Sequence, residues 1–146
     1  MAPPDEPGQK LVVTGVLIRA EDRTPIPRHR FRIFQADTTG EYQAKDPADE
    51  RTARLSADVT SDADGRFTVR TILPGVYGTP PGDPHLHLEV GGAEPPMHVV
   101  YFEGFVQEGT VRWQKTTEQA HIIAVTRTGD GTLDGHLTLP VRGMSR

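Results

Sequence analysis

The fold of this chain is decided by residues 61–77, which read Ser61-Asp62-Ala63-Asp64-Gly65-Arg66-Phe67-Thr68-Val69-Arg70-Thr71-Ile72-Leu73-Pro74-Gly75-Val76-Tyr77. The segment opens with a turn signal rich in Asp and Gly. It continues with seven residues in which β-branched and aromatic side chains prevail, and it turns again at Pro-Gly. We therefore expect a strand over 66–72 between two turns. A calcium loop at the start of the segment is not favoured, because no glutamate completes it at the required spacing.

Short strands between turns are also predicted along the rest of the chain. They lie at about 11–18, 31–35, 85–91, 97–103, 120–126 and 132–139. No helical period is sustained, and 15 Gly and 13 Pro suit a protein of many turns. A length of 146 residues is that of one domain. We predict a single all-β domain over 1–146, an antiparallel β-sandwich of about eight strands with long loops.

Two segments are expected to lack strands. Residues 1–9 are polar and rich in proline, which predicts a disordered tail. Residues 43–59 are polar with no steady period, so we expect mainly loop there, with room for one short helix. A loop of that length in a compact domain is more often functional or mobile than idle.

Composition excludes several classes of protein and of partner. The net charge of -4 is modest, so neither nucleic acid nor an anionic membrane is an expected partner. The chain has no cysteine, which excludes disulfides, thiolate metal sites and a cysteine nucleophile. No apolar stretch approaches the length of a membrane span, and no signal peptide is visible at the start. We therefore expect a cytoplasmic location.

Two tyrosines and two histidines are the candidates for chemistry. His85 and His87 form a His-x-His pair in a predicted strand, where alternation places both imidazoles on one face. Tyr77 comes just before them, and Tyr42 lies in a predicted loop. Two phenols and two imidazoles could hold one metal ion. The alternative is that each tyrosine is a packed turn residue and the histidines are a surface pair.

Four stretches of the chain resemble one enzyme family in their order and spacing. They are Phe34-Gln35-Ala36-Asp37-Thr38-Thr39-Gly40-Glu41-Tyr42, the segment 61–77 quoted above, Pro84-His85-Leu86-His87 and Val100-Tyr101-Phe102-Glu103-Gly104. The pattern resembles the intradiol ring-cleavage dioxygenases, which include protocatechuate 3,4-dioxygenase and catechol 1,2-dioxygenase. The resemblance covers roughly residues 11–105.

The resemblance implies a metal centre and a role for each ligand. By motif position, Tyr42, Tyr77, His85 and His87 bind one non-haem Fe(III), a hard ion that favours phenolate oxygen together with imidazole nitrogen. Tyr77 and His87 correspond to the axial ligands. Tyr77 is also the catalytic residue, because it leaves the metal and takes a proton from the substrate.

The resemblance also implies the reaction. The substrate would be a catechol, an aromatic 1,2-diol, and the second substrate would be O2. Cleavage between the two hydroxylated carbons would give a cis,cis-muconate. The protein itself would supply Lewis acidity, orientation and exclusion of water.

The chain departs from the family at positions next to the ligands. An arginine that usually stabilises negative charge on the substrate would fall at Gly82 or at Asp83, and a usual glutamine would fall at Val99. Loss of such an electrostatic group typically costs about 10²–10³ in rate. We name Arg70 and His98 as candidate substrate-binding residues, with Arg30 as a further cation that folding could bring in.

These departures keep a second function open. The alternative is a non-catalytic β-sandwich binding module that keeps the fold, with or without the metal. The chain also has no counterpart of the N-terminal helical region through which catechol-type members dimerise, so a homo-oligomer is left open. Tyr101 is assigned to the core.

Overall fold

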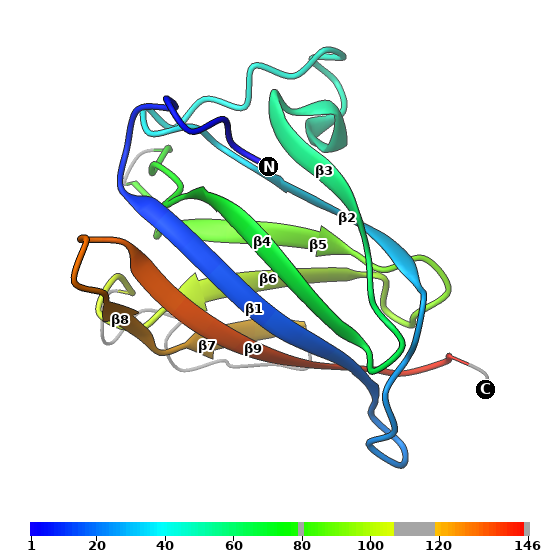
Figure 1. The fold of residues 1–146 in the computed structure, drawn as a ribbon. Helices are drawn as coiled ribbons and strands as arrows, with labels where there is room; N and C mark the ends of the chain where they lie inside the picture. Colours follow the sequence, from blue (N-terminus) through cyan, green and yellow to red (C-terminus); the bar gives the residue numbers. More distant parts are fainter. Residues whose placement is uncertain (79–80, 107–118, 145–146) are drawn as a thin grey trace.

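The computed structural model describes residues 1–78, 81–106 and 119–144 of the chain (Figure 1). Within them lie nine strands and one short 3-10 helix, η1, so the prediction of an all-β protein is confirmed. The elements in chain order are β1 (Lys10–Arg19), β2 (Arg30–Gln35), η1 (Glu50–Thr52), β3 (Leu55–Thr60), β4 (Arg66–Ile72), β5 (His85–Glu89), β6 (Met97–Phe102), β7 (Ala120–Ile123), β8 (Val125–Arg127) and β9 (Leu133–Val141). No helix in the described ranges is long and apolar enough to cross a membrane.

The strands form two sheets that pack face to face as a sandwich. One sheet has the order β4-β1-β9-β8 and the other the order β3-β2-β5-β6-β7 (Figure 1). The sheets are mixed rather than purely antiparallel, because β1 pairs with β9 and β6 pairs with β7 in parallel. The last long strand returns to run beside the first, a pairing that local sequence signals do not reveal.

The core lies between the two sheets and is built by alternation along the strands. In β5 the residues Leu86 and Leu88 face the core, and in β6 Val100 and Phe102 do the same. Burial of such side chains contributes roughly 1.5–3 kcal/mol each relative to exposure. The intervening residues of β5 and β6 therefore lie on the outer face of the five-stranded sheet, and His85 and His87 are among them.

The segment 43–59, for which mainly loop is expected, contains one strand that sequence alone misses. Its first part is loop and η1, but β3 pairs antiparallel with β2 from residue 55 onward. Leu55 is buried in this edge strand, whereas most of the other residues are partly or fully exposed. An edge strand that buries so little carries a weak hydrophobic pattern, which is why its signal was lost.

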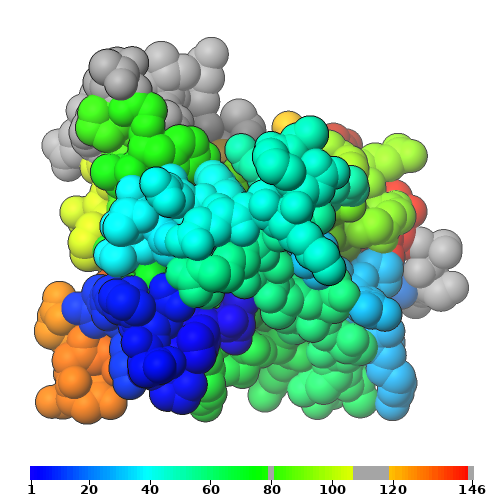
Figure 2. Space-filling model, turned by 90° about the horizontal axis from the view of Figure 1, so that it is seen from above, coloured from blue at the N-terminus to red at the C-terminus, as the bar shows by residue number. Residues whose placement is uncertain are grey.

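Residues 1–9, for which a disordered tail is expected, are placed against the rest of the domain. The backbone amide of Ala2 donates to the carbonyl of Arg70, and Glu6 forms an ion pair with Arg54 through both of its carboxylate oxygens. Figure 2 shows this segment (blue) beside the loop that follows β2 (cyan). Its partners lie about 50 or more residues away in the chain, so composition could not predict this contact.

Candidate metal centre

The two histidines of β5 point their Nε2 atoms at one another on the outer face of the sheet. Alternation puts them on the same side, and the two Nε2 atoms lie 3.1 Å apart. The Nδ1 atom of His85 lies 2.8 Å from the carbonyl oxygen of Asp83. A carbonyl only accepts, so Nδ1 carries the hydrogen of the neutral ring and Nε2 presents its lone pair to the site.

The two tyrosines close the group. The hydroxyl of Tyr42 lies 2.9 Å from Nε2 of His87 and 2.8 Å from the hydroxyl of Tyr77. The hydroxyl of Tyr77 in turn lies 3.2 Å from Nε2 of His85. The four contacts form a closed ring of two phenol oxygens and two imidazole nitrogens. The structure thus brings together all four residues that the sequence singles out.

The spacing of these four atoms suits a shared ion. Ligand atoms at about 2.0–2.1 Å from one metal and roughly 90–110° apart lie about 2.8–3.4 Å from each other. The four distances of 2.8, 2.9, 3.1 and 3.2 Å fall in that range. In the part of the chain that the structure describes, no cluster of three or more His, Cys, Asp or Glu could hold a metal. A centre here therefore depends on the phenols.

The protein environment favours the neutral forms of two of these ligands. Burial, the hydrogen bond with Tyr77 and nearby negative charge raise the pKa of Tyr42 far above its usual value of 10.0. Burial and the neighbouring His85 lower the pKa of His87 to about 4. A neutral imidazole is the ligand form of histidine, and the charge of a bound cation reverses the balance for the phenol.

A buried aromatic ring fixes the orientation of His87. Phe34 of β2 is paired with His87 across the strands, and the two rings stack with centroids 4.7 Å apart and planes 5° apart. Phe34 is only 2% exposed. The sequence pattern predicts a strand at Phe34 but gives no link between this residue and the site. The link depends on the pairing of Phe34 with His87 across the strands, which the sequence does not reveal.

The loops that carry the tyrosines are in contact through two glycines. Gly40, two residues before Tyr42, has φ +86°, and a Cβ there would lie 2.3 Å from the carbonyl oxygen of Val76. Gly75, two residues before Tyr77, would place a Cβ 2.5 Å from the carbonyl oxygen of Asp37. Side chains larger than hydrogen would force the loops apart, and the two phenols with them.

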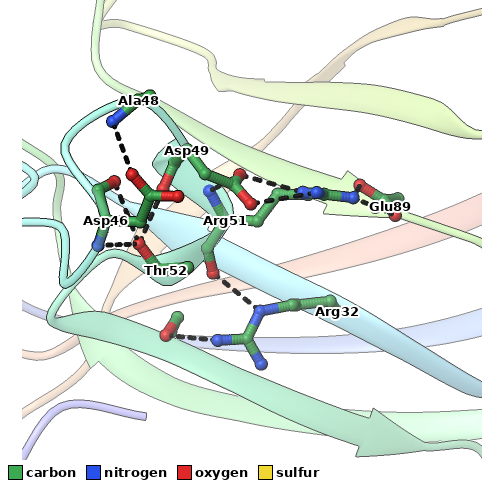
Figure 3. A network of polar contacts seen from close by, with 8 residues as sticks. Arg32, Asp46, Ala48, Asp49, Arg51, Thr52 and Glu89 are labelled. Atoms are coloured by element: carbon green, nitrogen blue, oxygen red, sulfur yellow. Dashed lines mark hydrogen bonds and ion pairs between the residues drawn. The ribbon is translucent and has the colours of Figure 1, made fainter.

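The chain beyond Tyr42 is fastened over the outer face of the sheet by Arg51 (Figure 3). Its guanidinium forms an ion pair with Asp49 at 2.9 Å and reaches Glu89 of β5 at 3.4 Å, while its carbonyl accepts from Arg32 of β2 at 2.7 Å. Such exposed pairs are individually weak, at about 0–1 kcal/mol. Together they place the loop against β2 and against β5, the strand that carries the two histidines.

The two residues named for substrate binding lie elsewhere. Arg70 is exposed on β4 in the other sheet, where it lines an open surface pocket with Val12, Thr68 and Asp134. His98 is paired with Leu88 but faces the core and is 1% exposed, with its Nδ1 3.2 Å from Nε2 of His121. Sequence spacing shows which residues share one face of a strand, but not which face lies at the site. Neither Arg70 nor His98 is on that face. The further cation, Arg30, forms an ion pair with Asp58 of β3.

The positions that depart from the family pattern do lie at the site. Val99 is the cross-strand partner of His87 on the outer face, and the amide of Gly82 donates to the carbonyl of Tyr77. Asp83 is buried and holds His85 through its backbone. Tyr101, assigned to the core from sequence, instead lies on the outer face, with its ring centroid 5.7 Å from that of His85.

Comparison with known sequences gives two kinds of match. A family model described as "Dioxygenase" matches residues 1–116. A catechol 1,2-dioxygenase of Acinetobacter baylyi is 34% identical over 102 residues, which is 67% of this chain and 32% of that protein. Catechol 1,2-dioxygenase 1 of Acinetobacter lwoffii is 32% identical over 103 residues, 68% of this chain and 33% of that protein. The chain thus spans about a third of the length of these curated relatives.

Solved structures share the fold. 3-Chlorocatechol 1,2-dioxygenase from Rhodococcus opacus 1CP superposes with a TM-score of 0.77 at 22% identity, covering 97% of this chain and 63% of that one. The dioxygenase domain of a dioxygenase carbohydrate-binding protein fusion from Streptomyces sp. SirexAA-E gives 0.72 at 23% identity, covering 98% and 86%. Since the family model spans most of the chain and a curated relative is more than 30% identical, this chain belongs to the intradiol ring-cleavage dioxygenase family.

Proposed function

We propose that this chain binds one non-haem Fe(III) and cleaves a catechol-type aromatic 1,2-diol with O2 to a cis,cis-muconate-type product. The observation that carries the proposal is the closed ring formed by the donor atoms of Tyr42, Tyr77, His85 and His87, with edges of 2.8–3.2 Å. Family membership supports the same reaction. The names of the curated relatives support a catechol as the substrate class.

The four side chains are suited to a ferric ion in particular. A hard trivalent cation favours phenolate oxygen, and two phenolates with two neutral imidazoles leave one net positive charge at the centre. Bound Fe(III) supplies the Lewis acidity that activates the diol toward dioxygen. Both oxygen atoms of O2 enter the product, so the reaction needs no external reductant.

Tyr77 is the residue that we assign to proton transfer. It is 40% exposed, whereas Tyr42 is partly buried and His87 is covered by Phe34. An incoming diol therefore reaches Tyr77 before the other ligands. The phenolate oxygen of Tyr77 would take the second proton of the diol and become a neutral phenol, while the remaining three ligands stay fixed to β5 and to the loop after β2.

A second function, metal binding without turnover, is favoured by the surroundings of the site. Two polar groups that normally support the reaction are replaced, one by Gly82 or Asp83 and one by Val99, and neither Arg30 nor Arg70 lies at the site. Val99 places an apolar surface beside His87. If turnover is lost, this chain would be a metal-binding β-sandwich module.

Under the main proposal, the partners of the chain are a catechol and O2, without nucleic acid or membrane.

A single anaerobic experiment separates the two functions. The iron-loaded protein is mixed with catechol without oxygen, and the visible spectrum is recorded before and after air is admitted. The proposed enzyme gives a shifted band on addition of catechol and ultraviolet absorption of a muconate after oxygen. A shifted band with no product assigns the chain to metal and diol binding alone, and an unchanged spectrum refutes catechol binding.

A further inference from the structure

Asp37 is a buried carboxylate at the centre of the loop that carries Tyr42. It is 6% exposed, and its Oδ1 accepts hydrogen bonds from the amide and hydroxyl of Thr39, at 2.9 and 2.6 Å, and from the amide of Glu41 at 3.1 Å. Its Oδ2 accepts from the side-chain amide of Gln43 at 2.6 Å. The residues on either side of Tyr42 are thus each tied to one oxygen of the same carboxylate.

The backbone of Asp37 reaches the loop of the other tyrosine. Its carbonyl accepts from the amide of Gly75 at 2.9 Å, two residues before Tyr77, and also from the amide of Gly40. Gln43, on the far side of Tyr42, has φ +47°, a left-handed conformation that costs free energy for a residue other than glycine. Its bond to Asp37 offsets that strain. One residue therefore touches both loops that carry the phenols.

The charge of Asp37 is held in place by its surroundings. Burial alone would raise the pKa of this carboxyl, but the hydrogen bonds from Thr39, Glu41 and Gln43 outweigh burial and lower the pKa to about 2. Arg54 lies 3.6 Å from Oδ2, and its own amide donates to the carbonyl of Tyr42 at 2.9 Å. The anion is therefore present at every pH at which the protein is handled.

We infer that Asp37 is a positioning residue of the metal centre: its carboxylate and carbonyl hold the Tyr42 and Tyr77 loops in one register, so that both phenol oxygens meet the histidine nitrogens. The inference rests on the proposed metal centre and extends it to a residue that touches no ligand atom. Residues that orient metal ligands in this way are typically worth about 10–100-fold in affinity or activity.

The chain contains a matched control for this inference. Asp62 forms the same turn, accepting at Oδ1 from the amides of Asp64 and Arg66, with Gly65 in the left-handed region. The turn links β3 to β4, is exposed and contacts none of the four ligands. Asp62→Asn therefore removes the same kind of charge from the same kind of turn without touching the tyrosine loops.

The test compares Asp37→Asn with Asp62→Asn in the iron-loaded and metal-free proteins. Asp37→Asn should lower the melting temperature more than Asp62→Asn, because Asp37 is buried and lies beside Arg54 whereas Asp62 is exposed. Asp37→Asn alone should shift the ferric-tyrosinate band and lower kcat by about tenfold or more with KM nearly unchanged. Asp37→Glu should restore part of the band. An unchanged band and kcat in Asp37→Asn would reduce Asp37 to a turn residue and overturn the inference.

A metal-free measurement keeps the inference separate from the proposed function. In metal-free protein, nuclear Overhauser contacts between the rings of Tyr42 and His87 should be strong in the wild type and in Asp62→Asn. They should weaken in Asp37→Asn. If these contacts persist in Asp37→Asn, the inference fails even where the wild type binds iron. If they weaken while the wild type takes up no iron, Asp37 still holds the two tyrosine loops in register, and the failure lies with the proposed metal centre alone.

Discussion

The hydroxyl oxygens of Tyr42 and Tyr77 lie 2.8 Å apart, although 35 residues separate them in the chain and they belong to different loops. Two neutral phenols so placed share one hydrogen bond. Two phenolates so placed would repel each other without a cation between them. This pair, together with His85 and His87, forms the proposed metal centre of the protein.

Replacement of Tyr77 by phenylalanine should separate metal binding from catalysis. Three ligands remain in Tyr77→Phe, so most of the iron should be retained, while kcat should fall by about 10²-fold or more because the proton acceptor is gone. Metal analysis and steady-state kinetics measure the two effects. The remaining tyrosine provides a control: Tyr101→Phe should keep the ferric-tyrosinate band. Normal turnover in Tyr77→Phe would refute the role assigned to it.

Removal of the histidine stacked on Phe34 should abolish metal binding. His87→Ala deletes a ligand on a rigid strand, and among the described residues no imidazole other than that of His85, itself a ligand, and no carboxylate lies in the ring to replace it. Iron content after dialysis should drop to background. His136→Ala, an exposed histidine on the other sheet that contacts Thr14, should bind iron as the wild type does. Equal iron content in the two variants would contradict the ligand set.

Because the tyrosine loops are in close contact at Gly40, a single added methyl group there should lower the free energy of unfolding strongly. Gly40→Ala meets the carbonyl oxygen of Val76 at 2.3 Å in addition to the strain of a positive φ. Gly131→Ala carries a similar strain at φ +88° with nothing within 4 Å of the added carbon. Chemical denaturation should show a loss of about 1–2 kcal/mol in Gly131→Ala and a clearly larger loss in Gly40→Ala. Equal losses in the two variants would mean that the loops move apart without cost, and would contradict a tight contact at Gly40.

The contact between buried His98 and half-buried His121 predicts loss of stability in weak acid. Burial and the neighbouring His98 lower the pKa of His121 to about 4, against an ordinary value of 6.5. Between these values the unfolded chain binds more protons than the native one, so stability falls as the pH is lowered through this window. Between pH 7 and pH 5, the titration of His121 should lower the free energy of unfolding by up to about 2 kcal/mol.

The prediction for His121 is checked by denaturation of metal-free protein at the two pH values. His121→Gln keeps a hydrogen-bonding side chain beside His98 but cannot titrate. It should lose measurably less stability between pH 7 and pH 5 than the wild type. Parallel losses in the two proteins would show that His121 does not titrate as its surroundings imply.

The sequence predicts those features of the fold that depend on local pattern. Alternation in β5 is enough to put His85 and His87 on one face, and the turn residues give the strand order along the chain. It misses β3, since an edge strand buries few side chains, and the parallel pairing of β1 with β9, since no local signal reports a partner 120 residues away. The contact of residues 1–9 with the rest of the domain is unpredictable for the same reason, because Glu6 pairs with Arg54, which lies far along the chain.

At the site, the sequence predicts the residues that belong to a motif. It does not predict those whose position depends on how the strands pair. Arg70 and His98 are named for substrate binding, but each lies on the side of its sheet that faces away from the ligands. Phe34 and Asp37 lie within a family motif that assigns neither of them a role. Their roles depend on cross-strand pairing with His87 and on contact with Gly75, which only the folded chain provides.

The measurement that tests the central claim most directly is the iron content and visible spectrum of the protein reconstituted with ferric iron. Four converging ligands predict close to one ferric ion per chain and a red-brown charge-transfer band, which should be lost together in His87→Ala. A colourless protein without stoichiometric iron would contradict the assignment of Tyr42, Tyr77, His85 and His87 as a ferric centre.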